Sequence, residues 1–254
     1  MNEIVTVFNS QQYNKAVNVF ITNSKRYSDK FTAICIDCSA ELISFLHETG
    51  CSIIDSKELV TKFKITPNSA FCVNKFILAF VYLKHYSESK NVALFSFSDI
   101  LIQQNIFNLV DKTVKTICIP HKIHQHQSLF GSINNIYGKY ISKILSEHYI
   151  ETETLFLGTK NNILAFIEEY ILEIKNIINK KQFYNEVNYA IIPKIIYFDI
   201  DRYSHFNFEH VALEAKHNFE LVKAIKFDSS TPYIIQNYVK NKPLESVVYE
   251  HFSK

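Results

Sequence analysis

The first half of the chain alternates short apolar runs with segments in which apolar residues recur at helical spacing. Ser39 suits a helix N-cap and Gly50 suits a left-handed C-cap. The pattern predicts strands at 3–10, 30–37, 51–55 and 91–102, with helices at 13–25, 39–50 and 69–87. This alternation predicts an α/β fold with a mainly parallel central sheet and helices on both faces.

The second half of the chain is less regular. Its apolar pattern predicts strands at 115–120, 153–159 and 191–201, a long helix at 162–179, and a further strand and short helix within 231–252. The polar, histidine-bearing stretch at 121–140 is interpreted as a loop. Because no repeat, linker or shift in composition interrupts the chain, we predict a single domain over residues 1–254.

The composition excludes several classes of protein. With 47% apolar residues the chain can bury a core, and its net charge of +2 indicates no nucleic-acid partner. No apolar run predicts a transmembrane segment and the N-terminus lacks a signal peptide, so we expect a cytoplasmic protein, at most peripheral at a membrane. Four glycines are too few for a phosphate loop or a Rossmann fingerprint in this sequence.

Five cysteines, an odd number, favour a reducing compartment over a disulfide framework. Cys35 and Cys38 form a Cys-x-x-Cys where a predicted strand ends. As a thiol redox site, this pair would need a lowered thiolate pKa. Core packing is the alternative, since Cys35 continues an apolar strand.

Two acidic stretches are candidate sites. Asp99 stands where the apolar run "ALFSFSD" ends, and ligands of open α/β sheets bind beyond the carboxyl ends of the strands. The rival is a complete Asp-x-Asp, Asp199 and Asp201, whose carboxylates would share one face of a strand. The alternatives are a solvated turn for Asp99 and, for the pair, a solvated strand end with Arg202 as its salt-bridge partner.

Other polar residues are candidates for binding or proton transfer. His121, His124 and His126 could coordinate zinc or accept a proton from a hydroxyl, the alternative being partly exposed loop histidines. Asn9 and Ser10 end the first predicted strand and could contact a nucleoside, the alternative being a helix N-terminal turn. Lys75 could offset phosphate charge, although a solvent-facing helix lysine is the default.

Four stretches of the sequence, taken in their order along the chain, form a further pattern. They are "KFILAFVYLKHYSESKNVALFSFSDILIQQN", "HYIETETLFLGTKNNILAFIEEYILEI", "KKQFYNEV" and "TPYIIQNYVKNKP". In spacing and apolar context they resemble the nucleotide-sugar-dependent glycosyltransferases of the GT-A fold. The resemblance covers most of the chain and implies a nucleotide-sugar-binding half at 1–105 and an acceptor-side half at 106–254.

The first and second stretches resemble the family's donor-site motifs but depart from them. Asp99 matches the last carboxylate of an Asp-x-Asp motif, and Phe97 occupies the place of the first. Residues 152–154 replace a pattern of the Asn-x-Gly kind. The resemblance implies donor binding by Asn9, Ser10, Lys75, Ser98 and Asp99, with Asp99 as a metal ligand.

The third and fourth stretches are similar to the family's motifs for the acceptor side and the phosphate. Gln182 and Asn185 match two polar positions, whereas Lys181 replaces an acid. Gln236 stands where the family has a metal-binding histidine, and Lys240 stands where a lysine approaches phosphate. With two ligands lost, the resemblance implies Mn²⁺ or Mg²⁺ held weakly, or action without metal.

The leading hypothesis from this resemblance is a glycosyltransferase that moves a sugar from a nucleotide-diphosphate donor to a hydroxyl acceptor. The acceptor would be a glycan or a lipid-linked sugar in the synthesis of a surface polysaccharide, of the capsule or lipopolysaccharide type. Two alternatives stay open, namely a catalytically inactive binding protein of the same fold and a thiol redox protein that uses Cys35 and Cys38.

Overall fold

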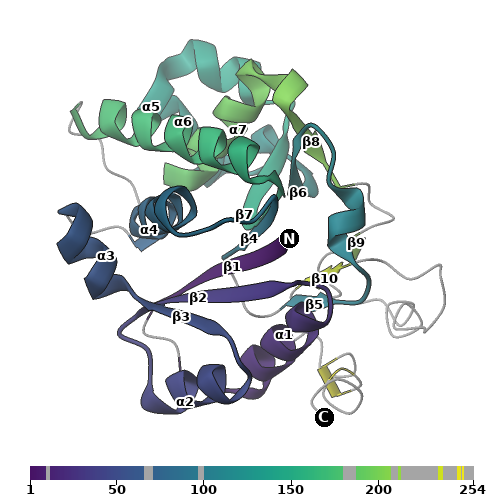
Figure 1. The fold of residues 1–254 in the computed structure, drawn as a ribbon. Helices are drawn as coiled ribbons and strands as arrows, with labels where there is room; N and C mark the ends of the chain where they lie inside the picture. Colours follow the sequence, from purple (N-terminus) through teal and green to yellow (C-terminus); the bar gives the residue numbers. More distant parts are fainter. Residues whose placement is uncertain are drawn as a thin grey trace.

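The computed structural model describes most of the chain (Figure 1). The described residues are 1–9, 12–65, 71–96, 100–179, 187–206, 211–212, 234–236, 245–246 and 248.

The N-terminal part folds as four parallel strands joined by helices, as predicted. Its strands are β1 (Asn2–Asn9), β2 (Lys30–Ile36), β3 (Ser52–Asp55) and β4 (Asn91–Phe95). Its helices are α1 (Lys15–Arg26), α2 (Ala40–Glu48), α3 (Ser56–Phe63) and α4 (Phe71–His85). Ser39 caps α2 and Gly50 follows it with a φ of 67°, which confirms both predicted caps.

The C-terminal part adds strands to the same sheet and builds a small second sheet. Its strands are β5 (Ile100–Ile102), β6 (Val114–Lys122), β7 (Tyr149–Thr159), β8 (Tyr203–His205), β9 (Val211–Ala212) and β10 (Ile234–Gln236). Its helices are the short η1 (Ile106–Leu109), η2 (Ile123–Gln125) and η3 (Ile200–Arg202), with α5 (Gln127–Leu145), α6 (Lys160–Asn179) and α7 (Val187–Phe198).

Among the described residues, the main sheet has seven strands in the order β3-β2-β1-β4-β7-β6-β8, and β5, β10 and β9 form the second sheet. Within the main sheet only β7 runs against the other strands. The predicted fold class, a mainly parallel sheet in an α/β fold, is therefore confirmed.

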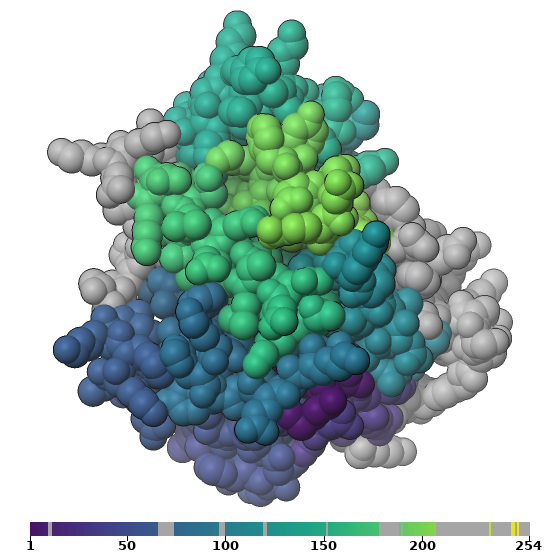
Figure 2. Space-filling view, turned by 45° about the horizontal axis from the view of Figure 1, so that its top comes forward, coloured from purple at the N-terminus to yellow at the C-terminus, as the bar shows by residue number. Residues whose placement is uncertain are grey.

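Helices cover both faces of the main sheet. On one face, α1 and α2 pack against the sheet, and on the other α4, α6 and α7 do so (Figure 1). Figure 2 shows α5, α6 and α7 packed together on the second face, coloured from teal to light green. The side chains of Phe76, Phe156 and Phe166 are fully buried there, and burying such a side chain stabilises the fold by about 1.5–3 kcal/mol. None of the described helices is long and apolar enough to cross a membrane.

Three of the predicted elements are wrong or incomplete. The stretch 191–201, predicted as a strand, belongs to α7 and η3, because its isoleucines bury one helical face and a short apolar run does not distinguish strand from helix. The stretch 121–140, interpreted as a loop, contains the end of β6, η2 and much of α5. Its buried residues, Leu129, Ile133 and Ile136, recur at helical spacing between polar residues.

The predicted strand 91–102 is two strands, β4 and β5, which belong to different sheets. Helix α3 was not predicted at all. It is short, and Asp55 caps it by accepting a hydrogen bond from the backbone of Lys57 at 2.8 Å. A single turn-initiating aspartate is a weak signal beside a strand of four residues.

Helix α4 is fastened to the amino ends of β1 and β2 by a buried carboxylate. The side chain of Glu3 is fully buried, and its partner in an ion pair is Lys30, whose Nζ lies 3.5 Å away. Four hydroxyl groups donate to this carboxylate: Thr32 (2.7 Å), Tyr82 (2.6 Å), Ser87 (2.5 Å) and Ser89 (2.7 Å). Burial alone would raise the pKa of Glu3, but these hydrogen bonds outweigh burial and hold the pKa below its ordinary value.

Candidate functional site

The carboxyl ends of the central strands meet at a topological switch point. The chain passes from β1 to β2 on one side and returns through β4 on the other, and ligands of open α/β sheets bind in the crevice at such a point. Asn9, the last residue of β1, is exposed and is paired with Ile36 of β2. Asp37 directly follows Ile36, the last residue of β2, and therefore lies at the same edge of the sheet.

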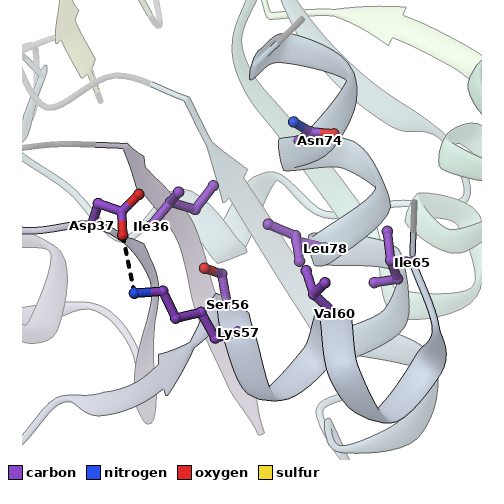
Figure 3. Close-up of a pocket in the computed structure, with 8 residues that line it drawn as sticks. All are labelled: Ile36, Asp37, Ser56, Lys57, Val60, Ile65, Asn74 and Leu78. Carbon is purple, nitrogen blue, oxygen red and sulfur yellow. Dashed lines mark ion pairs between the residues drawn. The ribbon is translucent and has the colours of Figure 1, made fainter. Parts of the chain in front are cut away.

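A cavity of about 220 Å³ opens beside this edge, between α3 and α4 (Figure 3). Its lining consists of apolar side chains with a few polar ones: Ile36, Asp37, Ser56, Lys57, Val60, Ile65, Asn74 and Leu78. Small-molecule sites have this composition, in which apolar walls hold a ligand and a few polar groups orient it.

Among the polar residues that line the cavity, Asp37 has an unusual backbone conformation. Its φ is 48°, in the left-handed region that few residues other than glycine adopt. Its Oδ1 lies 3.3 Å from Nζ of Lys57, and both side chains are largely exposed (Figure 3). A sparsely populated conformation at a strand end is a feature that functional sites share. The sequence analysis missed Asp37, although it follows an apolar strand just as Asn9 does.

On the other flank of α4, Lys75 forms a partly buried ion pair with Glu153 of β7. The distance from Lys75 Nζ to Glu153 Oε2 is 2.7 Å, and the side chains are 6% and 14% exposed. The same Oε2 accepts a hydrogen bond from Asn188 of α7. Tyr170 of α6 in turn donates its hydroxyl to Asn188 Oδ1. One carboxylate thus connects three helices with the sheet.

An irregularity in β7 directs Glu153 toward these helices. Thr116 of β6 pairs with Phe156, whereas Cys118 pairs with Glu151. Strand β7 therefore advances five residues where β6 advances two. The hydroxyl of Thr152 holds this bulge by donating to the carbonyl oxygen of Ile117 at 2.9 Å. Bulges of this kind turn a side chain to a new direction and are common next to active sites.

Several known structures with a similar fold are glycosyltransferases. Mouse xyloside xylosyltransferase 1, in its apo form, matches with a TM-score of 0.58 and 10% identity over 93% of this chain and 98% of its own. The galactosyltransferase LgtC, solved with donor and acceptor sugar analogues, matches with a TM-score of 0.53 and 9% identity over 92% of this chain and 86% of its own. The protein has a GT-A-type glycosyltransferase fold.

A third structure with this GT-A-type fold is the bifunctional glycosyltransferase WbbM, with a TM-score of 0.54 and 12% identity. The alignment covers 99% of this chain and 51% of WbbM. Neither a protein-family model nor a curated protein matches the sequence. The likeness is therefore one of fold, and the roles of individual residues must be argued from this chain.

Several residues that the resemblance to GT-A enzymes singled out lie outside the described part of the chain. They are Ser10, Ser98, Asp99, Gln182, Asn185 and Lys240. For Gln236 the structure describes the backbone in β10. Their proposed roles in donor, metal or acceptor binding stay predictions.

The structure does place Lys75, and it corrects the default expectation of a solvent-facing lysine. Its side chain is buried, and its ammonium group is paired with Glu153 at the carboxyl edge of the GT-A sheet. This pairing offsets the charge that Lys75 was expected to offer to a phosphate group.

The histidine candidates lie on the surface after β6. Nδ1 of His124 is 2.9 Å from the carbonyl oxygen of Ser146 and 3.3 Å from Glu147 Oε1. Nδ1 of His126 is 3.2 Å from the hydroxyl of Ser128. Both rings are exposed and have local partners. A catalytic role for them stays a prediction without support from this geometry.

The rival Asp-x-Asp is not in a strand, so the argument that Asp199 and Asp201 share one strand face is wrong. Asp199 stands between α7 and η3, and its Oδ2 lies 2.9 Å from Nε of Arg202. The alternative interpretation, an ion pair with Arg202, is confirmed. Asp201 is exposed.

The environment of Cys35 does not favour the thiol redox hypothesis in which Cys35 is the attacking thiol. A hydrogen bond with Cys38, followed by burial, raises the pKa of the Cys35 thiol. A redox site needs the opposite shift, because the thiolate is the reactive form. The described cysteines, Cys35, Cys38, Cys51 and Cys118, are all free thiols.

The expected divalent cation has no ligand set among the described residues. No group of three or more histidine, cysteine, aspartate or glutamate side chains in that part of the chain could hold a metal ion. Glu153 is the carboxylate beside the end of β4, but Lys75 already neutralises it. The described residues thus do not fit the cation on their own, and no step of the chemistry is derived through one.

Proposed function

We propose that this chain transfers a sugar from a nucleotide-diphosphate donor to a hydroxyl acceptor. The observation that carries this proposal is the cavity beside the carboxyl end of β2, next to the switch point of a GT-A-type sheet. At about 220 Å³ it is smaller than the roughly 300–1,000 Å³ of whole-ligand pockets. It therefore suits one portion of a donor, and the apolar walls suit the flat face of a nucleobase.

The groups on the rim of the cavity fit a nucleoside. The carboxylate of Asp37 can accept hydrogen bonds from a base or ribose, and the amide of Asn74 can both donate and accept. From this cavity a diphosphate would extend toward the end of β4, where the resemblance places Ser98 and Asp99. In this arrangement residues 1–105 bind the donor, and residues 106–254 receive a glycan or lipid-linked acceptor.

The proposal also assigns residues to the diphosphate and to the acceptor. Lys240, and Mn²⁺ or Mg²⁺ where Asp99 holds one, would offset negative charge on the leaving diphosphate. Gln182 and Asn185 would line the acceptor side. The synthesis of a surface polysaccharide is the setting that the sequence resemblance suggests, and the acceptor hydroxyl would come from that glycan.

The first experiment measures binding and turnover with the intact chain. UDP-, GDP- and CMP-linked sugars are supplied with Mn²⁺, with Mg²⁺ and with chelator, and both released nucleotide and the change in melting temperature are recorded. We expect the sugar of one UDP- or GDP-linked donor to be released or transferred, whereas CMP-linked sugars, which carry a single phosphate, should not react. Binding without turnover under every condition, with acceptor sugars present, would instead support the inactive binding protein, and absence of both would refute the proposal.

The second experiment tests the cavity. Asp37→Asn should weaken binding of the matching nucleoside diphosphate at least tenfold, because a charged hydrogen-bond acceptor contributes about 1.5–3 kcal/mol. The matched control is Glu147→Gln, which breaks a surface ion pair of similar exposure with Lys122, outside the residues that line the cavity. Equal affinities of Asp37→Asn and the unsubstituted protein in calorimetry would contradict this placement of the nucleoside.

A further inference from the structure

Among the described residues, the two donors to the carboxylate of Glu153 both bind the same oxygen. Oε2 accepts from Lys75, at 2.7 Å, and from Asn188. No described residue donates a hydrogen bond to Oε1, and the side chain is 14% exposed. A carboxylate oxygen has room for further donors, so Oε1 can accept a hydrogen bond from a molecule outside the protein.

The groups that hold Glu153 are more deeply buried than Glu153 itself. Lys75 is 5% exposed, Asn188 is 4% exposed and Tyr170 is fully buried. Withdrawing such charges from water is costly, and apolar residues of similar volume would often stabilise a fold as well or better. Stability alone therefore does not account for a lysine, an asparagine and a tyrosine fixed around one carboxylate. A role in fixing the direction of this carboxylate does account for these three residues.

The position of Glu153 is next to the proposed donor site. The backbone N–H of Ser96, which directly follows β4, donates to the carbonyl oxygen of Thr154 at 3.1 Å. The bulge that carries Glu153 is therefore adjacent to the carboxyl end of β4. Asn74 lines the cavity and Lys75 holds Glu153, so the two sites flank the same turn of α4.

We propose that Glu153 contacts the substrate, with Oε1 accepting a hydrogen bond from a hydroxyl group of a sugar bound beyond the end of β4. Lys75 and Asn188 are positioning residues that orient this oxygen. This inference rests on the proposed function, because it takes the ligand at that edge to be a sugar. A carboxylate that accepts from a hydroxyl forms a charge-assisted hydrogen bond, which is stronger and more selective than a neutral one.

Glu153→Gln tests the contact, since glutamine keeps the size of the side chain and loses the charge. With the donor found in the panel above, kcat/KM should fall at least tenfold. The affinity for the free nucleoside diphosphate, which carries no sugar, should stay within twofold of the unsubstituted protein. A kcat/KM equal to that of the unsubstituted protein would overturn the inference. So would a loss of affinity for the nucleoside diphosphate as large as the loss of kcat/KM.

A second variant distinguishes a contact between Glu153 and the substrate from mere neutralisation of the Lys75 charge. In Glu153→Gln the ammonium group of Lys75 loses the carboxylate charge of Glu153, and that alone could disturb the site. The double variant Lys75→Met with Glu153→Gln removes both charges. If Glu153 only balances Lys75, the double variant should recover kcat/KM, and this recovery would overturn the inference. A kcat/KM that stays at least tenfold low supports the contact.

The control is Glu3→Gln, which removes another buried carboxylate paired with a lysine, at the amino ends of the strands. It should lower the melting temperature and leave kcat/KM unchanged where the protein is folded. Failure of the proposed function is recognised separately, because the unsubstituted protein would then neither bind nor turn over any donor. If it turns over a donor and Glu153→Gln does so equally, only the present inference fails.

Discussion

Two carboxylates, each paired with a lysine, lie at opposite ends of helix α4. At the amino edge of the sheet, Glu3 is fully buried, and both of its oxygens accept hydrogen bonds from protein hydroxyl groups. At the carboxyl edge, Glu153 is partly exposed and only one of its oxygens is held by described residues. Tyr82 and Lys75, seven residues apart on α4, serve the two networks.

The difference between these networks separates a structural role from a functional one. A carboxylate with every acceptor position filled has no capacity left for a ligand, and its hydrogen bonds contribute to the stability of the fold. A carboxylate that is firmly oriented but incompletely bonded is prepared for a further partner. The same residue types thus do different work at the two edges of one sheet.

The largest expected effect concerns Glu3. Glu3→Gln should lower the free energy of unfolding by about 3–5 kcal/mol, because it replaces a buried carboxylate that accepts from four hydroxyl groups and leaves some of these donors facing an amide NH₂ group. Urea denaturation at neutral pH, followed by circular dichroism, measures this loss. A change below about 1 kcal/mol would show that this network is not structural.

A smaller effect is expected in the other network. Tyr170→Phe removes the hydroxyl that donates to Asn188, so the free energy of unfolding should fall by about 0.5–1.5 kcal/mol. The kcat/KM should fall severalfold as Asn188 loses its fixed orientation. If the loss of stability equals that of Glu3→Gln, the two networks are equally structural and the contrast between them is wrong.

The smallest expected effect is on the pH dependence of the free energy of unfolding. The pKa of Glu3 is lower in the folded protein than its ordinary value of 4.5, so its contribution is complete above that value. The contribution is lost as the pH falls through the lowered pKa. Unfolding free energies measured between neutral pH and pH 3 should therefore decline less steeply for Glu3→Gln than for the unsubstituted protein. Parallel curves would contradict this assignment.

Local signals in the sequence account for the part of the fold that could be predicted. The first strands and helices are bounded by polar residues, and Ser39 and Gly50 mark the ends of α2. The isoleucines of 191–196 fit both a strand and a helix, and only packing against the sheet decides for the helix. The edge of the sheet at which we propose the donor site follows from strand order alone.

The networks could not be predicted, because their partners are remote in the sequence. Lys75 and Glu153 are 78 positions apart, and Glu153 reaches Lys75 only because a bulge turns it. In the sequence, Glu153 was visible merely as a departure from a family pattern. Asp37 gave a clearer signal as a polar residue after an apolar strand, but its left-handed backbone is a property of the folded chain.

The place of β7 constrains the order in which the sheet can assemble. In the finished sheet β7 lies between β4 and β6, although it is synthesised after both. While the chain leaves the ribosome, β4 and β6 each have an unpaired edge until residues 149–159 emerge. Unpaired edges promote association between chains. A nascent chain that stalls before Tyr149 should therefore depend on chaperones, whereas one that has passed Thr159 can insert β7 between β4 and β6. The second edge of β6 is then paired when β8 follows.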